Sequence, residues 1–169
     1  MSAFSVNGFG TAGMVSTHSD PESWTFERDI LQPSHHQSVR YDVDTRLGVQ
    51  GNWRISPKWE VVGQVVAKQQ ADTNLLQQSV EWAFASYRPT PDWVIRVGRT
   101  DFDLFLLSEY RNVGFAYPWV RPNVEFYGWM PLHSVDGIDI AKTWVGEDAT
   151  WRAKFNVGRS DVNAPGSGN

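Results

Sequence analysis

Apolar and polar residues alternate with a period of two along much of the chain, whereas the 3.6-residue period of an amphipathic helix is weak almost everywhere. The clearest example is residues 45–55, in which one face is free of charge and the other is polar. The uncharged face consists of Leu47, Val49, Gly51, Trp53 and Ile55. A period of two is that of a β-strand, so the pattern predicts an all-β protein.

The same alternation predicts an antiparallel meander of about seven strands in a single domain. The expected strands cover residues 3–16, 43–55, 59–69, 79–88, 92–99, 137–144 and 150–158 of the 169 residues. Residues 56–58 join two of these strands into a hairpin that places Trp53 opposite Val61 and Arg54 opposite Glu60. A shift of one residue would set apolar side chains against polar ones along the whole ladder, so the pattern selects this register.

A second hairpin is expected through residues 88–91, with Trp82 opposite Val97 and Phe84 opposite Ile95. The same register pairs Ser86 with Trp93, and the other face consists of Glu81, Ala83, Ala85, Val94 and Arg96. The second hairpin therefore continues the division of the sheet into an apolar and a polar side.

The connections between the expected strands alternate in length. Residues 56–58 and 88–91 are short, whereas residues 17–42 and 100–135 are long. Short turns at one rim and long loops at the other are typical of an outer-membrane β-barrel. A loop as long as 100–135 is uncommon unless it is functional, and we expect it to fold inward into a wide lumen.

Two arrangements account for the alternation. In a soluble sheet the apolar face packs on a core and the polar face meets water. In a transmembrane barrel the apolar face meets lipid and the polar face lines a water-filled lumen. Aromatic rings beside the two short connections favour the barrel, because such rings prefer a lipid–water interface. These rings belong to Trp53, Trp59, Tyr87 and Trp93.

The composition and motifs of the chain argue against several other functions. The chain has no Cys, which excludes disulfides and thiolate chemistry, and its net charge of -4 without a Lys/Arg-rich run argues against nucleic acid as a partner. No apolar run reaches the roughly 18 residues of a transmembrane helix. His35 and His36 are two potential metal ligands without a third, so no metal site is assigned, and no cofactor is expected. No Ser/His/Asp pattern stands out, so we expect the protein not to be an enzyme.

Two stretches carry a family resemblance. Val-Gly-Arg at residues 97–99 ends an expected strand and runs into the long loop, and Gly-Phe-Gly at residues 8–10 lies in the first strand. The chain resembles the porin-like outer-membrane proteins of Gram-negative bacteria, as a strand pattern over nearly its whole length and most specifically over residues 97–137. It has about half the strands of a typical porin and lacks the usual terminal aromatic residue, so we expect it to be the N-terminal part of such a barrel.

The resemblance implies a channel in the bacterial outer membrane for passive diffusion of small hydrophilic solutes or ions, often as a homotrimer in the lipid bilayer. It also implies that acidic residues of the long loop face a basic strip of the barrel wall and narrow the pore. The matching candidates are Asp101, Asp103 and Glu109 on the loop and Arg46, Arg54 and Arg96 on the wall. Arg111 and Arg121 are interpreted as clamps that hold the loop through carboxylates or ring faces. The alternative hypothesis is a soluble Trp-rich β-sandwich that binds carbohydrate or a protein partner.

Overall fold

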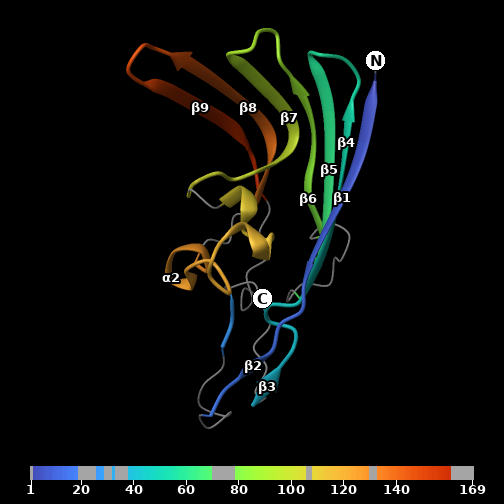
Figure 1. Cartoon of the computed structure of the whole chain (residues 1–169), viewed down its shortest axis with the longest axis vertical. Helices are drawn as coiled ribbons and strands as arrows, with labels where there is room; N and C mark the ends of the chain where they lie inside the picture. Colours follow the sequence, from blue (N-terminus) through green and yellow to red (C-terminus); the bar gives the residue numbers. More distant parts are fainter. Residues whose placement is uncertain are drawn as a thin grey trace.

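One antiparallel sheet dominates the molecule, and its strands lie beside one another in chain order except for a short excursion after the first (Figure 1). The coordinates are a computed structural model, which describes residues 2–18, 26–28, 32, 38–69, 79–105, 108–129 and 133–160. The strands of the sheet, in spatial order, are β1 (Ala3–Thr11), β4 (Arg46–Arg54), β5 (Trp59–Lys68), β6 (Val80–Tyr87), β7 (Trp93–Asp101), β8 (Ser134–Val145) and β9 (Thr150–Arg159). The all-β, antiparallel meander predicted from the alternation is confirmed.

The strand expected over residues 3–16 is divided. Its second part is β2 (Val15–Ser16), which leaves the large sheet and pairs with β3 (Val39–Arg40) in a separate two-stranded sheet. Between the two parts, Gly13 lies so close to Asp44 that an added Cβ would come within 2.5 Å of the Asp44 Cβ. The chain therefore leaves the sheet at a point where the backbone approaches another segment more closely than a side chain would allow.

The first predicted hairpin is confirmed in its register. Trp53 lies opposite Val61 and Arg54 lies opposite Glu60 along the whole β4–β5 ladder. The connection is short, and the backbone N–H of Ile55 donates to the carbonyl of Trp59 at 3.0 Å. The row that contains Trp53 and Val61 stays free of charge over both strands, and every charged residue falls in the other row, which selected the register in the sequence.

The predicted register of the second hairpin is wrong by three residues. Phe84 lies opposite Gly98 and not opposite Ile95. An odd shift exchanges the two faces of a strand, so Phe84 shares its face with Arg96, whose guanidinium carbon lies 5.4 Å from the ring centroid. Both faces of β6 carry apolar groups, so alternation alone does not distinguish the registers. The observed pairing lets Arg96 meet Asp139 of β8 on the polar face.

The turn between β6 and β7 is held by its own polar groups. The Thr90 hydroxyl donates to Oδ1 of Asp92 at 2.6 Å, and this hydrogen bond lowers the pKa of the Asp92 carboxyl below its usual value. The Asp92 carbonyl accepts from the backbone N–H of Thr143 at 2.9 Å. The short rim of the sheet is thus tied together across three strands.

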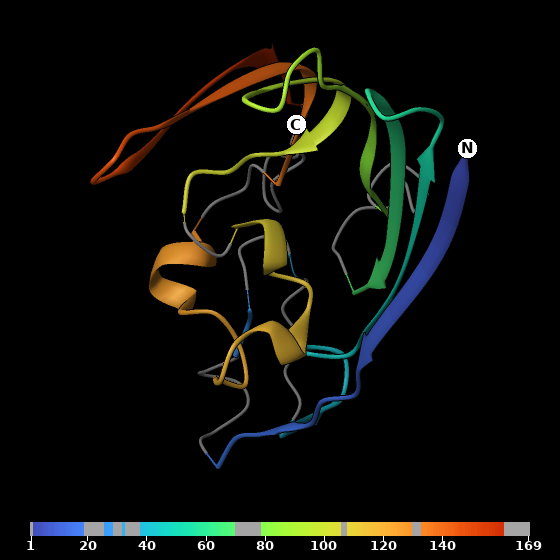
Figure 2. The same ribbon diagram turned by 45° about the horizontal axis from the view of Figure 1, so that its top comes forward.

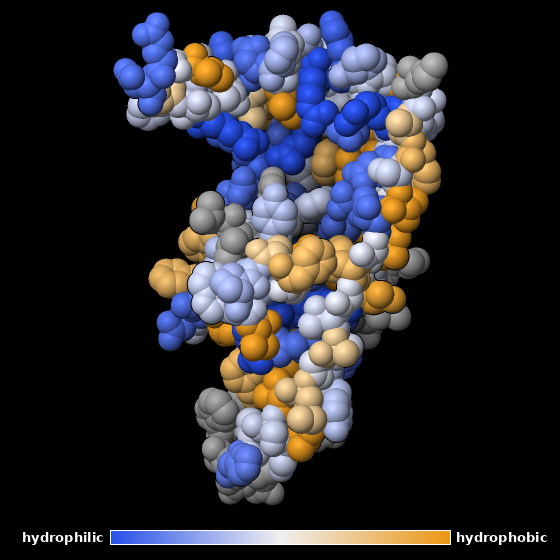
Figure 3. Space-filling view, in the orientation of Figure 1, coloured by the Kyte–Doolittle hydropathy of each residue, from blue (hydrophilic) through white to orange (hydrophobic). Residues whose placement is uncertain are grey.

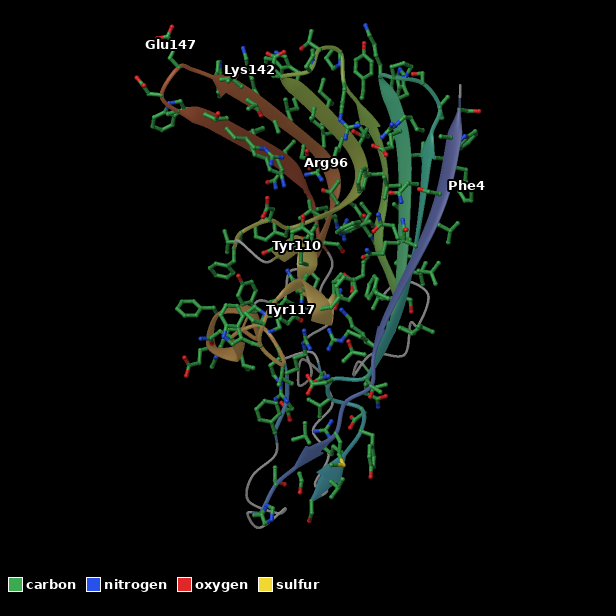
Figure 4. All side chains as sticks on the ribbon, in the orientation of Figure 1. Phe4, Arg96, Tyr110, Tyr117, Lys142 and Glu147 are labelled. Carbon is green, nitrogen blue, oxygen red and sulfur yellow. The ribbon has the colours of Figure 1, made fainter. Side chains whose placement is uncertain are left out.

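The two faces of the large sheet differ in polarity and in exposure. The concave face carries buried polar residues, among them Arg46, Gln64, Glu81, Ser86, Thr100 and Asp139. The convex face carries exposed apolar residues, among them Val6, Leu47, Val49, Val65, Val97, Ile140 and Phe155. Phe4 points away from the hollow of the sheet, whereas Arg96 points into it (Figure 4). In the space-filling view, hydrophilic residues gather in the hollow and hydrophobic residues follow the outer side along β1 (Figure 3).

The sheet is open. β1 and β9 form its two edges, and within the described residues no sheet closes on itself. The structure therefore shows a strongly curved seven-stranded sheet and not a closed barrel.

Residues 102–133, named the long segment from here on, connect β7 to β8 and lie on the concave side of the sheet (Figure 2). The sequence showed no regular structure there. The described part contains three short helical turns, η1 (Ser108–Tyr110), η2 (Gly114–Ala116) and α2 (Val124–Tyr127). The long segment thus sets side chains of its own opposite the polar wall of the sheet.

Candidate functional site on the concave face

An ion cluster around Asp44, just before β4, fastens the long segment. Asp44 is buried, and its carboxylate accepts from Nη2 of Arg121 at 2.7 Å and from Nη1 of Arg28 at 3.3 Å. The Arg121 guanidinium also lies over the ring of Phe26, with its carbon 4.4 Å from the centroid. The predicted role of Arg121 as a clamp that uses a carboxylate and a ring face is confirmed.

Arg46 and Arg28 bind the middle of the long segment. Nη1 of Arg46 donates to Oδ1 of Asn112 at 3.0 Å. Nη2 of Arg28 donates to the carbonyl of Arg111 at 2.6 Å and to the Tyr117 hydroxyl at 3.2 Å. Because a guanidinium offers five donors in a rigid plane, each arginine fixes the direction as well as the distance of the segment.

These contacts leave a pocket between the long segment and the wall, named the cationic pocket here. Its lining comprises Arg28, Arg46, Lys68, Arg111, Asn112, Pro122, Tyr127 and His133. Its empty volume is about 330 Å³, including the part that opens to solvent. Within the described part of the chain, the lining holds no carboxylate. The pocket therefore presents positive charge and hydrogen-bond donors.

The carboxylates that balance these cations lie next to the pocket and are not part of its lining. Lys68 pairs with Glu81 at 2.5 Å, and both side chains are 7% exposed. Arg28 pairs with Asp44, as described above. Nη2 of Arg111 lies 3.8 Å from Oδ1 of Asp101. That distance is too long for a hydrogen bond, so the interaction is purely a charge attraction.

A second charged cluster lies further along the wall, on β7, β8 and β9. Arg96 forms a two-pronged ion pair with Asp139, with Nε to Oδ1 at 3.0 Å and Nη2 to Oδ2 at 2.7 Å. Nζ of Lys154 lies 3.9 Å from the same carboxylate and 3.3 Å from Oδ2 of Asp103 on the long segment. Lys154 thus bridges the wall and the long segment.

The structure brings four of the six predicted site residues to the concave side. Asp101 ends β7 and is buried, and Asp103 lies on the long segment. Arg46 and Arg96 lie on the wall. Arg54 lies at the far end of β4, beside the short connection, and does not meet the long segment.

The sixth predicted residue, Glu109, falls in η1, and its side chain lies outside the described part of the chain. The expected pairing of loop acids with wall bases takes a different form from the one predicted. Asp103 meets Lys154, whereas Arg46 binds the amide of Asn112 and Arg96 binds a carboxylate of the neighbouring strand.

Sequence reasoning missed Arg28, Lys68, Asp139 and Lys154 as parts of the site. For three of them a signal was present. Lys68 continues the polar face of its strand, Asp139 stands between Ile138 and Ile140, and Lys154 alternates with aromatic and small residues. Arg28 lies in an irregular stretch without periodicity, so only the tertiary fold places it.

Within the described residues, no helix has the length and apolar character needed to cross a membrane. No three His, Asp or Glu side chains of that part gather as metal ligands, and His35 and His36 lie outside it. Comparison with models of protein families, with curated proteins and with solved structures gives no significant match. The functional argument therefore rests on the geometry of this chain.

Proposed function

We propose that the protein forms part of a porin-like channel in the bacterial outer membrane, through which small hydrophilic solutes or ions diffuse passively. The observation that carries this proposal is that, in the part of the chain that the structure describes, more polar than apolar residues are buried, the reverse of a water-soluble protein. Among the described residues, thirteen polar or charged residues are buried and six apolar ones are. In water, apolar side chains are driven into the interior of a protein. A sheet that exposes its apolar face is therefore better suited to the hydrocarbon of a lipid bilayer.

The dimensions of the convex face agree with a bilayer. β4, β5 and β8 have 9, 10 and 12 residues, and a tilted transmembrane strand needs about 9–11. Charges on this face stand at its ends. Arg99 pairs with Asp136 at 2.7 Å near the long-loop rim. Between the two rims the face is apolar, as hydrocarbon requires.

Aromatic residues follow the short-turn rim, where an interfacial girdle is expected. The rings of Trp59 and Tyr87 stack with their centroids 4.6 Å apart. At the same rim, Nζ of Lys142 lies 4.9 Å from the centroid of Trp93 and 5.1 Å from that of Trp144. A lysine that rests on aromatic rings at the edge of an apolar band reaches toward the headgroups without entering the hydrocarbon.

The open edges of the sheet have a consequence for this proposal. In hydrocarbon each unpaired backbone group at β1 and β9 costs several kcal/mol. A barrel that contains this sheet therefore needs further strands, from a longer protein or from other copies. The 169-residue chain alone should not insert as a stable monomer.

A planar-bilayer recording tests the proposal. The protein encoded by the native reading frame, purified in detergent from membranes, is expected to give stepwise increases in conductance. Absence of conductance steps at every voltage would remove the channel. A protein that is monodisperse without detergent would instead favour the soluble Trp-rich sandwich that binds carbohydrate or another protein. Chemical crosslinking in detergent tests the homotrimer.

A further inference from the structure

Arg111, which lines the cationic pocket, has a buried donor without an acceptor among the described residues. The Arg111 side chain is 9% exposed, and its Nε donates to the carbonyl of Ser108 at 3.3 Å. Its Nη2 is fully shielded, yet it makes no hydrogen bond with any described residue. An unsatisfied buried charged group is costly, because it gives up its hydration and gains no bond in return.

Several cationic side chains also gather around this atom. Five cationic side chains meet at the pocket and its clamp within the described part of the chain, namely Arg28, Arg46, Lys68, Arg111 and Arg121. Among the described residues, the carboxylates of Asp44, Glu81 and Asp101 lie close to these cations. These carboxylates lie outside the lining, so a negative group that enters the pocket meets cations first.

We propose that the cationic pocket binds one oxyanion group, the carboxylate or phosphate of a small solute, with Arg111 as its main donor and Arg46 and Lys68 beside it. This inference rests on the proposed function in that it names the class of solute that the channel would favour. An arginine fork matches the oxygens of a carboxylate or phosphate, and charge-assisted hydrogen bonds of this kind are about twice as strong as neutral ones.

The pocket also offers a place for the rest of an organic anion. Tyr127 lines it, and the ring of Tyr127 meets that of Phe105 edge to face, with centroids 5.3 Å apart. An aromatic wall next to a cationic pocket suits a solute with an apolar body and one acidic group. Benzoate has this form, whereas inorganic phosphate has the acidic group alone, so the two probes separate the two sources of oxyanion.

Binding is measured by isothermal titration calorimetry on the full-length protein in detergent at low salt, with inorganic phosphate, benzoate and the neutral benzamide as probes. Wild-type protein is expected to bind benzoate at least tenfold more tightly than benzamide. Arg111→Gln should weaken the binding of whichever anion binds at least tenfold, which is about 1.4 kcal/mol. Arg54→Gln is the matched control, because the same substitution is made outside the pocket, and it should leave affinity unchanged.

The folding of each variant is checked by far-UV circular dichroism. If Arg111→Gln does not fold, Arg111→Lys replaces it. This variant keeps the charge and loses the fork, so it should weaken binding by a smaller factor. Equal affinity of wild type and the Arg111 variant, equal affinity for benzoate and benzamide, or no binding of any probe at millimolar concentration would overturn the inference. Conductance without anion binding rejects this inference alone, whereas anion binding without conductance rejects the channel alone.

Discussion

The orientation of the sheet can be tested with one charged residue on its convex face. Val65 lies near the middle of β5, opposite Val49, and is 49% exposed. It stands six residues from Trp59 in the short-turn rim. At about 3.3 Å per residue and a tilt of about 40°, this places Val65 roughly 15 Å below the rim, near the middle of an apolar band about 25 Å tall.

Val65→Arg should therefore cost about 2–4 kcal/mol in a bilayer. At 1.4 kcal/mol per tenfold, the folding equilibrium constant falls roughly 25-fold to 700-fold. In a soluble protein the same change at a half-exposed site would lie within about 0.5 kcal/mol. The two environments thus predict effects that differ by more than the error of a denaturation experiment.

The assay is reversible unfolding of the full-length protein in lipid vesicles with guanidinium chloride, followed by tryptophan fluorescence. Ile55→Arg is the matched control, because Ile55 is 45% exposed, continues the convex row of Trp53 and lies directly after β4 at the short-turn rim. There the cost should be about 0–1 kcal/mol, since the penalty falls toward the interface. Equal destabilisation by the two substitutions would refute the assignment of the convex face to lipid.

Two more predictions concern the long segment and the sheet. Asp101→Asn with Asp103→Asn should lower the cation-to-anion permeability ratio, because Arg111 loses a nearby carboxylate. At about 1 kcal/mol per charge at 4 Å in water, each neutralised carboxylate changes the ratio by up to about fivefold, and an unchanged reversal potential would contradict a role in ion preference. Gly98→Ala should destabilise the protein by roughly 1–3 kcal/mol, because Gly98 has φ +127° and an added Cβ would lie 2.3 Å from a carbonyl oxygen. Gly63→Ala, whose Cβ would meet nothing within 4 Å, should leave the denaturation midpoint nearly unchanged.

The fold was largely predictable because alternation acts over whole strands. In β4 and β5 every position is assigned to a face, so one register alone satisfies both strands. In β6 both faces are partly apolar, so alternation does not decide which residues of β7 lie opposite it, and the second hairpin was misaligned. The register irregularity between Gln64 and Val65 in the β5–β6 ladder is likewise not indicated by alternation.

The sequence predicted that charged residues form the site, but it did not predict which of them pair with one another. Charged residues on the polar face were recognised from sequence, since polarity follows the same period as the strand. Which charges meet depends on the path of the long segment, which has three short helical turns and no periodicity. The ion pair between Arg121 and Asp44 joins residues 77 positions apart, and no local pattern indicates such a contact.

The lipid-facing surface and the cationic pocket depend on one another through the geometry of a strand. Val65 and Gln64 are neighbours in β5, so they point to opposite faces. If Val65 faces hydrocarbon, Gln64 and the wall around Arg46 face the enclosed side, and that side must contain water because buried guanidinium and carboxylate groups are not stable in an apolar medium. A wet interior lined by charge and an apolar exterior would therefore be two consequences of a single register, and the proposed solute path along the concave face rests on the same alternation that places valine outside.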